Sequence, residues 1–198
     1  NSRLIPKPPL KRYKPIEFFS IKGRFINQVN PDESISIVNY IETKIKKNQS
    51  LGIATFSLKQ RDKVLNELEL RSKLSHSFYK KLESLKRNGF FVKNIENIQG
   101  EEREIIIIGT TYGLDNKDRF KELLGPINTK KRGHKLLNVL ITRAIEKKIV
   151  FSSIPENIFS NFKPLIEKNG NRGKSILYAY LYYAKAISDN QTEKISEV

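Results

Sequence analysis

A short polar segment, residues 96–104, concentrates acidic side chains in a chain whose formal net charge is +16. Glu101, Glu102 and Glu104 place three carboxylates within four positions. Such acidity runs against the composition of the whole chain and predicts a functional loop. A metal-dependent nuclease is the weaker interpretation, because the loop lacks the carboxylate-x-Lys pairing on adjacent strands that such a core requires. The segment leads directly into four isoleucines at 105–108.

Arg143 is a further candidate catalytic residue, outside the acidic segment. A helical pattern is predicted over residues 136–146, with a broad apolar arc and a polar face formed by Asn138, Thr142 and Glu146. Arg143 falls inside the apolar arc. A guanidinium cannot shed its charge and is costly to bury unpaired, so it must emerge at the edge of the core or into a cleft that supplies an anion. The alternative is a packed stem with its charged end in water.

Residues 170–175, Gly-Asn-Arg-Gly-Lys-Ser, match the end of a phosphate-binding loop of the pattern G-x-x-x-x-G-K-[ST]. The first glycine of that pattern should stand at position 168, which is Lys168. No apolar strand leads into the segment, and no strand ends in the acidic pair that would hold Mg²⁺. We therefore predict a basic start to a helix here in preference to a phosphate-binding loop.

The composition favours a nucleic-acid partner. The 198 residues include 37 Lys and Arg against 21 Asp and Glu, a balance that attracts polyanions, although a general lysine bias would give the same count. The chain has no cysteine, and His76 and His134 lie far apart, so we predict no metal site. No apolar run approaches the roughly 18 residues that a membrane span needs, so we expect no membrane contact and an intracellular location. The chain contains no methionine, which suggests a piece of a longer polypeptide.

The elements that position these residues alternate between strands and helices. Four consecutive isoleucines without polar alternation predict a strand buried on both faces, typical of the centre of a parallel α/β sheet, with the acidic loop at its entrance. Alternating elements predict a mainly parallel sheet with flanking helices. The expected strands are 16–21, 51–56, 90–92, 105–108 and 148–151, and the expected helices are 30–47, one beginning near 59, 75–87, 136–146 and 176–187. We expect a basic, proline-rich arm at 1–15, the main domain at 16–155, a helical extension at 156–187 and a loose tail at 188–198.

In combination, these segments resemble motifs of superfamily 1 helicases. Residues 96–104 with the isoleucine strand are similar to motif V, and Leu137-Asn138-Val139-Leu140-Ile141-Thr142-Arg143-Ala144 is similar to motif VI, the "LNVALTRA" helix of the second RecA-like domain. Residues 51–56 with Gln60 resemble motif IV. The resemblance covers about residues 23–155 and implies a RecA-like fold of the P-loop NTPase type.

The resemblance also implies functions for individual residues. Arg143 is expected to act as an arginine finger toward ATP that is held, with Mg²⁺, mainly on a first RecA-like domain absent from this chain. Nucleotide contacts are implied for Gln99, Gly100, Glu102 and Gln60. Contacts to DNA or RNA are implied for Thr55, Asn97, Tyr112 and Thr142. These roles require Arg143 and Glu102 to meet at one edge of the sheet.

Three positions depart from the family pattern. Leu136 and Ile145 replace basic residues on either side of motif VI, and Tyr112 replaces an arginine after the motif V strand. Tyr112 could instead stack on a base. We expect the second motor domain of an ATP-dependent helicase or translocase, inactive by itself. The alternative is a non-catalytic basic module that binds nucleic acid.

Overall fold

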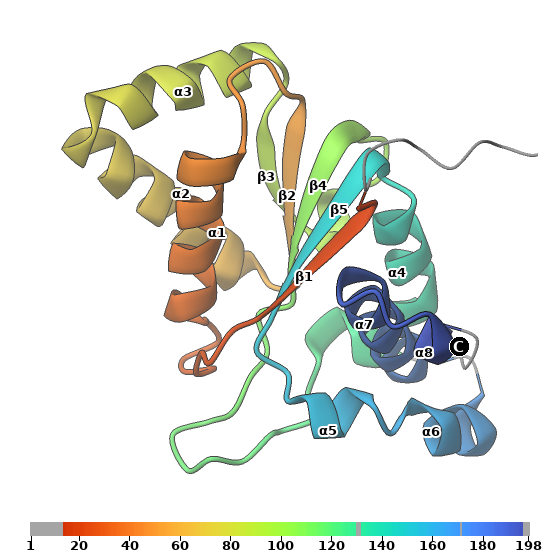
Figure 1. Cartoon of the computed structure of the whole chain (residues 1–198). Coiled ribbons are helices and arrows are strands. Elements are labelled where there is room, and N and C mark those ends of the chain that lie inside the picture. Colours follow the sequence, from red (N-terminus) through yellow and green to blue (C-terminus); the bar gives the residue numbers. More distant parts are fainter. Residues whose placement is uncertain (1–13, 130–131, 171, 196–198) are drawn as a thin grey trace, which may run out of the picture.

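In the computed structural model, residues 14–129, 132–170 and 172–195 are described, and they form a five-stranded sheet in the order β1-β5-β4-β2-β3 (Figure 1). Every neighbouring pair of strands is parallel. The strands are β1 (Ile16–Ser20), β2 (Leu51–Thr55), β3 (Phe91–Asn94), β4 (Arg103–Gly109) and β5 (Ala144–Ser152). The predicted RecA-like α/β fold is confirmed, and so is the central position of the isoleucine strand, because β4 lies between β5 and β2.

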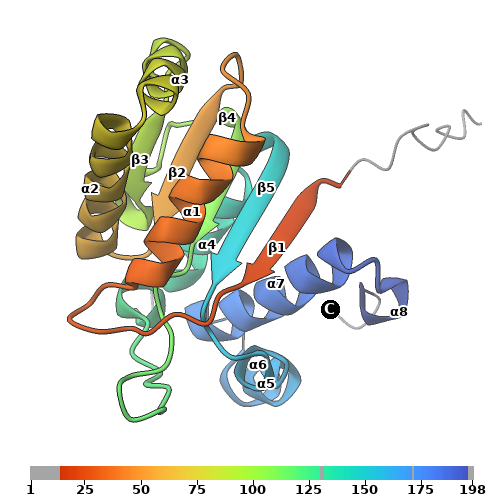
Figure 2. The same cartoon turned by 60° about the vertical axis from the view of Figure 1, so that its left-hand side comes forward.

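Helices cover both faces of the sheet. On one face lie α1 (Pro31–Lys44), α2 (Leu58–Leu74) and α3 (His76–Arg87); on the other lie α4 (Gly133–Ile141) and α7 (Gly173–Ser188), as Figures 1 and 2 show. The shorter helices are α5 (Glu156–Phe159), α6 (Phe162–Asn169) and α8 (Thr192–Ile195), with 3-10 turns η1 (Ile95–Asn97) and η2 (Gly125–Asn128). None of the described helices is long and apolar enough to cross a membrane.

The isoleucine strand fills both hydrophobic cores. Ile105 and Ile107 pack with α1, α2 and α3, whereas Ile106 and Ile108 pack with α4 and α7. Successive side chains of a strand point to opposite faces, so an unbroken apolar run is what a doubly covered strand requires. The start of α1 also forms as its sequence predicts, because the side chain of Asn30 accepts a hydrogen bond from the backbone N–H of Glu33 and proline stands at the first helical position.

The predicted helix over residues 136–146 is wrong at both ends. α4 begins at Gly133 and ends at Ile141, and β5 starts at Ala144. The backbone N–H of Arg103 donates to the carbonyl of Arg143 (3.1 Å), so pairing with β4 replaces the helical hydrogen bonds from this point. Arg143 therefore lies in the connection between α4 and β5, and Ile145, placed in the apolar arc by the helical pattern, is 69% exposed.

The two ends of the chain differ from expectation or lie outside the described residues. The predicted arm at 1–15 lies almost entirely outside the described residues. Part of the predicted loose tail, residues 188–198, is helical, because it contains α8. α7 packs against β1, where the hydroxyl of Ser188 accepts a hydrogen bond from the backbone N–H of Phe18 (2.9 Å).

Candidate functional site

The amino edge of the sheet, where the parallel strands begin, brings together Glu102 and Arg143. Glu102 directly precedes β4, and Arg143 directly precedes the neighbouring strand β5. The Arg143 Nη1 and Glu102 Oε1 atoms are 3.6 Å apart. In Figure 1 this edge is at the top, where α4 leads into β5. The expectation that these two residues meet at one edge is confirmed.

Arg143 is held mainly by the end of the preceding helix, α4. Its Nε donates to the carbonyl of Val139 (3.0 Å), and its Nη2 donates to the hydroxyl of Thr142 (3.0 Å). The carboxyl end of a helix carries partial negative charge, which favours a cation there. The Arg143 side chain is 20% exposed, so its stem is packed while part of the guanidinium faces solvent. The side chain is thus mostly packed, as either interpretation of the sequence requires, and its role toward an anionic ligand stays a prediction.

The three carboxylates of the acidic loop differ in their partners and in their exposure. Glu101 pairs with Lys93 (2.7 Å) and Arg103 (3.0 Å), and the hydrogen bond from Lys93 is the main cause that lowers the pKa of Glu101. Glu104 accepts a hydrogen bond from the backbone N–H of Ser50 (2.9 Å) and joins the loop to β2. Among the three, only Glu102 is exposed. It is therefore the carboxylate of this loop that a ligand could reach.

Gln99 and Gly100 form the exposed turn before Glu102. Gly100 has a φ of +84°, and a Cβ at this position would meet no atom within 4 Å. The open space beside Gly100 and its left-handed backbone are features that let a ligand approach the main chain closely. Ile98, fully buried, anchors the turn to the core.

Gln60 lies at the opposite, carboxyl edge of the sheet, where the strands end, and the structure does not bring it to Arg143. Its side chain is fully buried and makes three hydrogen bonds. Its Oε1 accepts from the backbone N–H of Asn30 (2.7 Å), and its Nε2 donates to the Asn30 carbonyl (2.9 Å) and the Ser34 hydroxyl (3.0 Å). In this arrangement Gln60 joins α2 to the start of α1.

The residues expected to contact nucleic acid are split between the two edges. Thr55, fully buried, ends β2, and its hydroxyl donates to the carbonyl of Ser57 (3.0 Å). Asn97 is exposed at the end of η1, which follows β3. Thr142 is exposed at the amino edge beside Arg143.

Tyr112 follows the end of β4 and is packed into the protein. Only 4% of its surface is exposed, and its ring makes edge contacts with Phe25 and Phe56. Its hydroxyl lies over Gly125, where an added Cβ would be 2.5 Å away. Stacking of Tyr112 on a base stays a prediction, and the burial of the ring in this conformation does not favour it.

The carboxyl edge carries an apolar pocket of about 710 Å³ that the sequence analysis did not identify. Its apolar lining includes Phe25, Leu58, Tyr112 and Leu123, and Lys59 and Glu96 supply charge. Leu58 and Leu123 are strongly exposed, at 49% and 72%. The signal in the sequence was the long Gly- and Pro-containing segment 112–133, a length that is usually functional in a compact domain.

The glycine-lysine segment at 170–175 does not follow a strand. It connects α6 to α7, and Gly173 begins α7. Lys174 Nζ pairs with Glu122 (2.6 Å), and a Cβ on Gly173 would lie 2.2 Å from the carbonyl oxygen of Ile127. The glycine therefore permits close packing of α7 on η2, and the basic start to a helix predicted from the sequence is confirmed.

Among the described residues, no group of three or more His, Cys, Asp or Glu side chains could hold a metal ion. The fold and its amino edge define a RecA-like domain. A sequence model of the family described as an AAA domain matches residues 14–154, and the chain belongs to this family, as a domain of the superfamily 1 helicase type.

Two relatives extend the comparison. The chain is 33% identical over 181 residues to the "Uncharacterized ATP-dependent helicase MG140" of Mycoplasma genitalium, a match that covers 89% of this chain and 15% of the relative. It is also 33% identical over 189 residues to the "Uncharacterized ATP-dependent helicase MG140 homolog" of Mycoplasma pneumoniae, covering 88% and 15%. The chain thus spans about 15% of the length of each relative.

Proposed function

We propose that this domain is the second motor domain of an ATP-dependent superfamily 1 helicase or translocase, and that it supplies an arginine finger to a nucleotide site shared with a first RecA-like domain of the same polypeptide. The observation that carries the proposal is the meeting of Arg143 and Glu102 at the amino edge. The names of the two relatives agree with an ATP-dependent helicase.

The residues of the amino edge fit a nucleotide presented from outside the domain. ATP with Mg²⁺, held mainly by the first domain, supplies the phosphoryl group that is transferred to water. Arg143 would place its positive charge against the phosphoryl oxygens, where charge spreads in the transition state. Glu102, exposed on the same edge, would accept hydrogen bonds from the ribose. Gln99 and Gly100 would approach the nucleotide through their backbone.

DNA or RNA would bind at the carboxyl edge. Asn97 is exposed there, and the apolar pocket offers a surface on which bases can rest, with Lys59 for the backbone phosphates. The buried Thr55 and Tyr112 would act by shaping this surface. Gln60, fully hydrogen-bonded between α1 and α2, is left out of the nucleotide site that we propose.

The test is turnover of the polypeptide that carries both motor domains. Arg143→Ala should lower ATP turnover on the order of 10³-fold while largely sparing ATP binding, because the finger acts on the transition state. Arg61→Ala is the matched control, since Arg61 is a partly exposed arginine paired with its neighbour Asp62 on α2. The 198-residue chain alone should show no ATP hydrolysis stimulated by nucleic acid. Near-normal turnover of Arg143→Ala would refute the finger.

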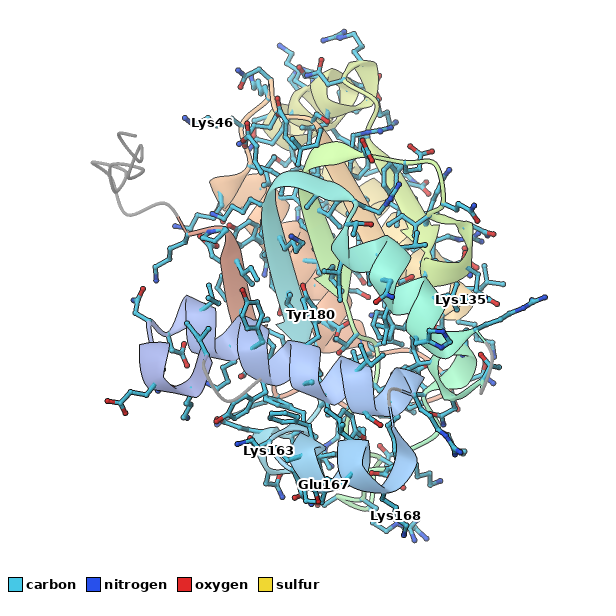
Figure 3. All side chains as sticks on the ribbon, turned by 90° about the vertical axis from the view of Figure 1, so that its right-hand side faces the viewer. Lys46, Lys135, Lys163, Glu167, Lys168 and Tyr180 are labelled. Atoms are coloured by element: carbon cyan, nitrogen blue, oxygen red, sulfur yellow. The ribbon has the colours of Figure 1, made fainter. Side chains whose placement is uncertain are left out.

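The alternative function is a non-catalytic basic module that binds nucleic acid. It is favoured by the exposed lysines after α1 and on α4, including Lys46 and Lys135, which Figure 3 shows at separate places on the surface. The basic clusters are Lys44, Lys46 and Lys47, and Lys130, Lys131, Arg132 and Lys135, of which Lys130 and Lys131 lie outside the described residues. Turnover that ignored Arg143, together with salt-sensitive binding that depended on these clusters, would establish this function.

A further inference from the structure

Thr142, the residue before Arg143, has a hydroxyl that is bonded on two sides. It donates to the carbonyls of Asn138 and Val139, both at 3.0 Å, at the end of α4. It also accepts from Arg143 Nη2 at 3.0 Å. A hydroxyl has one proton and two lone pairs, so using the proton on the helix carbonyls leaves the lone pairs for the guanidinium. Thr142 is thereby oriented as an acceptor for Arg143.

Thr142 and the carbonyl of Val139 hold two nitrogen atoms of the planar Arg143 guanidinium. Nε is held by Val139 and Nη2 by Thr142. A guanidinium has five N–H donors in a rigid fork, so fixing two of them sets the direction of the remaining donors. The Nη1 end, toward Glu102, is the part left to meet a ligand. A charged group that is already oriented loses less conformational freedom when it binds.

We propose that Thr142 is a positioning residue for Arg143, and not a contact to nucleic acid. The inference rests on the proposed function, because it assigns Thr142 to the same site as the finger. Thr142 lies at the amino edge, whereas the apolar pocket and Asn97 follow strands at the carboxyl edge. Its one proton is shared between the carbonyls of Asn138 and Val139, and a lone pair accepts from Arg143, so the hydroxyl has no further proton to donate to a phosphate.

The first measurement uses the 198-residue chain. We expect the ¹⁵N–{¹H} nuclear Overhauser effect of Arg143 Nε to show a rigid side chain, and Thr142→Val, which keeps the shape but removes the hydroxyl, to make it more mobile. Thr142→Ser should restore the rigid signal. Thr43→Val is the matched control, since the Thr43 hydroxyl donates to the carbonyl of Asn39 (2.8 Å) on an exposed face of α1. Equal mobility of Arg143 in the wild type and Thr142→Val would overturn the inference.

The second measurement is turnover of the polypeptide with both motor domains at saturating nucleic acid. Thr142→Val should lower kcat about tenfold, the size expected for one hydrogen bond to a charged group, with ATP affinity and nucleic-acid affinity unchanged. Thr142→Ser should recover most of the loss. In an Arg143→Ala background, Thr142→Val should add nothing, because its effect passes through the arginine.

The outcomes separate this inference from the proposed function. Normal turnover of Arg143→Ala refutes the finger and the positioning role together. A large loss in Arg143→Ala with no loss in Thr142→Val refutes the positioning role alone. A Thr142→Val variant that binds nucleic acid more weakly but keeps its kcat at saturation would show that Thr142 is a nucleic-acid contact, and would also overturn the inference.

Discussion

Glu33 offers a sharp test of how the carboxyl edge is built. It lies in the first turn of α1 and is fully buried. Its Oε1 accepts a hydrogen bond from the backbone N–H of Thr111 (2.8 Å), and its Oε2 has no hydrogen-bond partner among the described residues. Burial raises the pKa of Glu33 to about 8, against the opposing effect of the hydrogen bond from the Thr111 backbone N–H and of the nearby Thr110 hydroxyl. The folded protein therefore favours the protonated carboxyl.

The consequence for stability has a definite sign. Because the pKa of Glu33 is about 8 in the folded state and near its ordinary value of 4.5 in the unfolded chain, its contribution is fully present below pH 4.5 and is lost as the pH rises through 8. Each pKa unit corresponds to about 1.4 kcal/mol, so the total is on the order of 5 kcal/mol. Glu33→Gln carries no titrating proton and keeps an oxygen to accept from Thr111.

The assay is urea unfolding of the 198-residue chain between pH 5 and pH 9. The free energy of unfolding of the wild type should fall relative to Glu33→Gln as the pH rises, with most of the divergence before pH 8. Glu167→Gln is the control, because Glu167 is an exposed residue of α6, labelled in Figure 3. A difference between wild type and Glu33→Gln that stays constant across this range would refute the reasoning.

Two further substitutions test the packing of the sheet and the function of the glycine-lysine segment. Gly52→Ala would place a Cβ 2.3 Å from Phe91 Cζ and 2.8 Å from Ile106 Cδ1, and should lower the free energy of unfolding by about 1–3 kcal/mol in urea titrations; an unchanged midpoint would contradict this packing. Lys174→Ala should leave ATP binding and turnover of the two-domain polypeptide unchanged, because Lys174 pairs with Glu122; turnover that depended on Lys174 would establish a phosphate-binding loop instead.

The central strand could be predicted because its determinants are local, whereas the meeting of Arg143 and Glu102 at the amino edge was implied by the resemblance to superfamily 1 helicases. Four adjacent isoleucines require burial on both faces, and this places β4 mid-sheet. In the structure Glu102 and Arg143 each directly precede a strand, and parallel pairing of β4 and β5 brings them to the same edge. From the residues alone the start of β5 at Ala144 was not evident, because the predicted helix over residues 136–146 includes Arg143.

The end of α4 could not be predicted, because a distant strand determines it. Ala144 and Ile145 continue the helical spacing of apolar residues, and nothing nearby in the sequence stops the helix. The stop comes from the hydrogen bond between Arg103 N–H and the Arg143 carbonyl, and from the Thr142 hydroxyl, which bonds to the last turn. Thr and Ser hydroxyls compete in this way with helical backbone hydrogen bonds.

The burial of Gln60 and Tyr112 likewise could not be predicted from the sequence. Gln60 is fully buried because Asn30 and Ser34, which belong to the start of α1, satisfy its amide. Tyr112 is covered by Phe25, which comes from the segment between β1 and α1. Both environments are assembled from parts of the chain that are remote in sequence, so residue type and spacing alone gave no sign of them.

Under the proposed function, the sheet must transmit the effect of nucleotide at its amino edge to nucleic acid at its carboxyl edge. β4 begins beside Glu102 at the amino edge and ends beside Tyr112 at the carboxyl edge. It is paired along its length with β2 and β5, and residues 105–109 are buried. A densely packed central strand resists local deformation. Nucleotide-driven movement would then reach the nucleic-acid edge by motion of the whole domain against its partner, with Arg143 as the contact that senses the nucleotide.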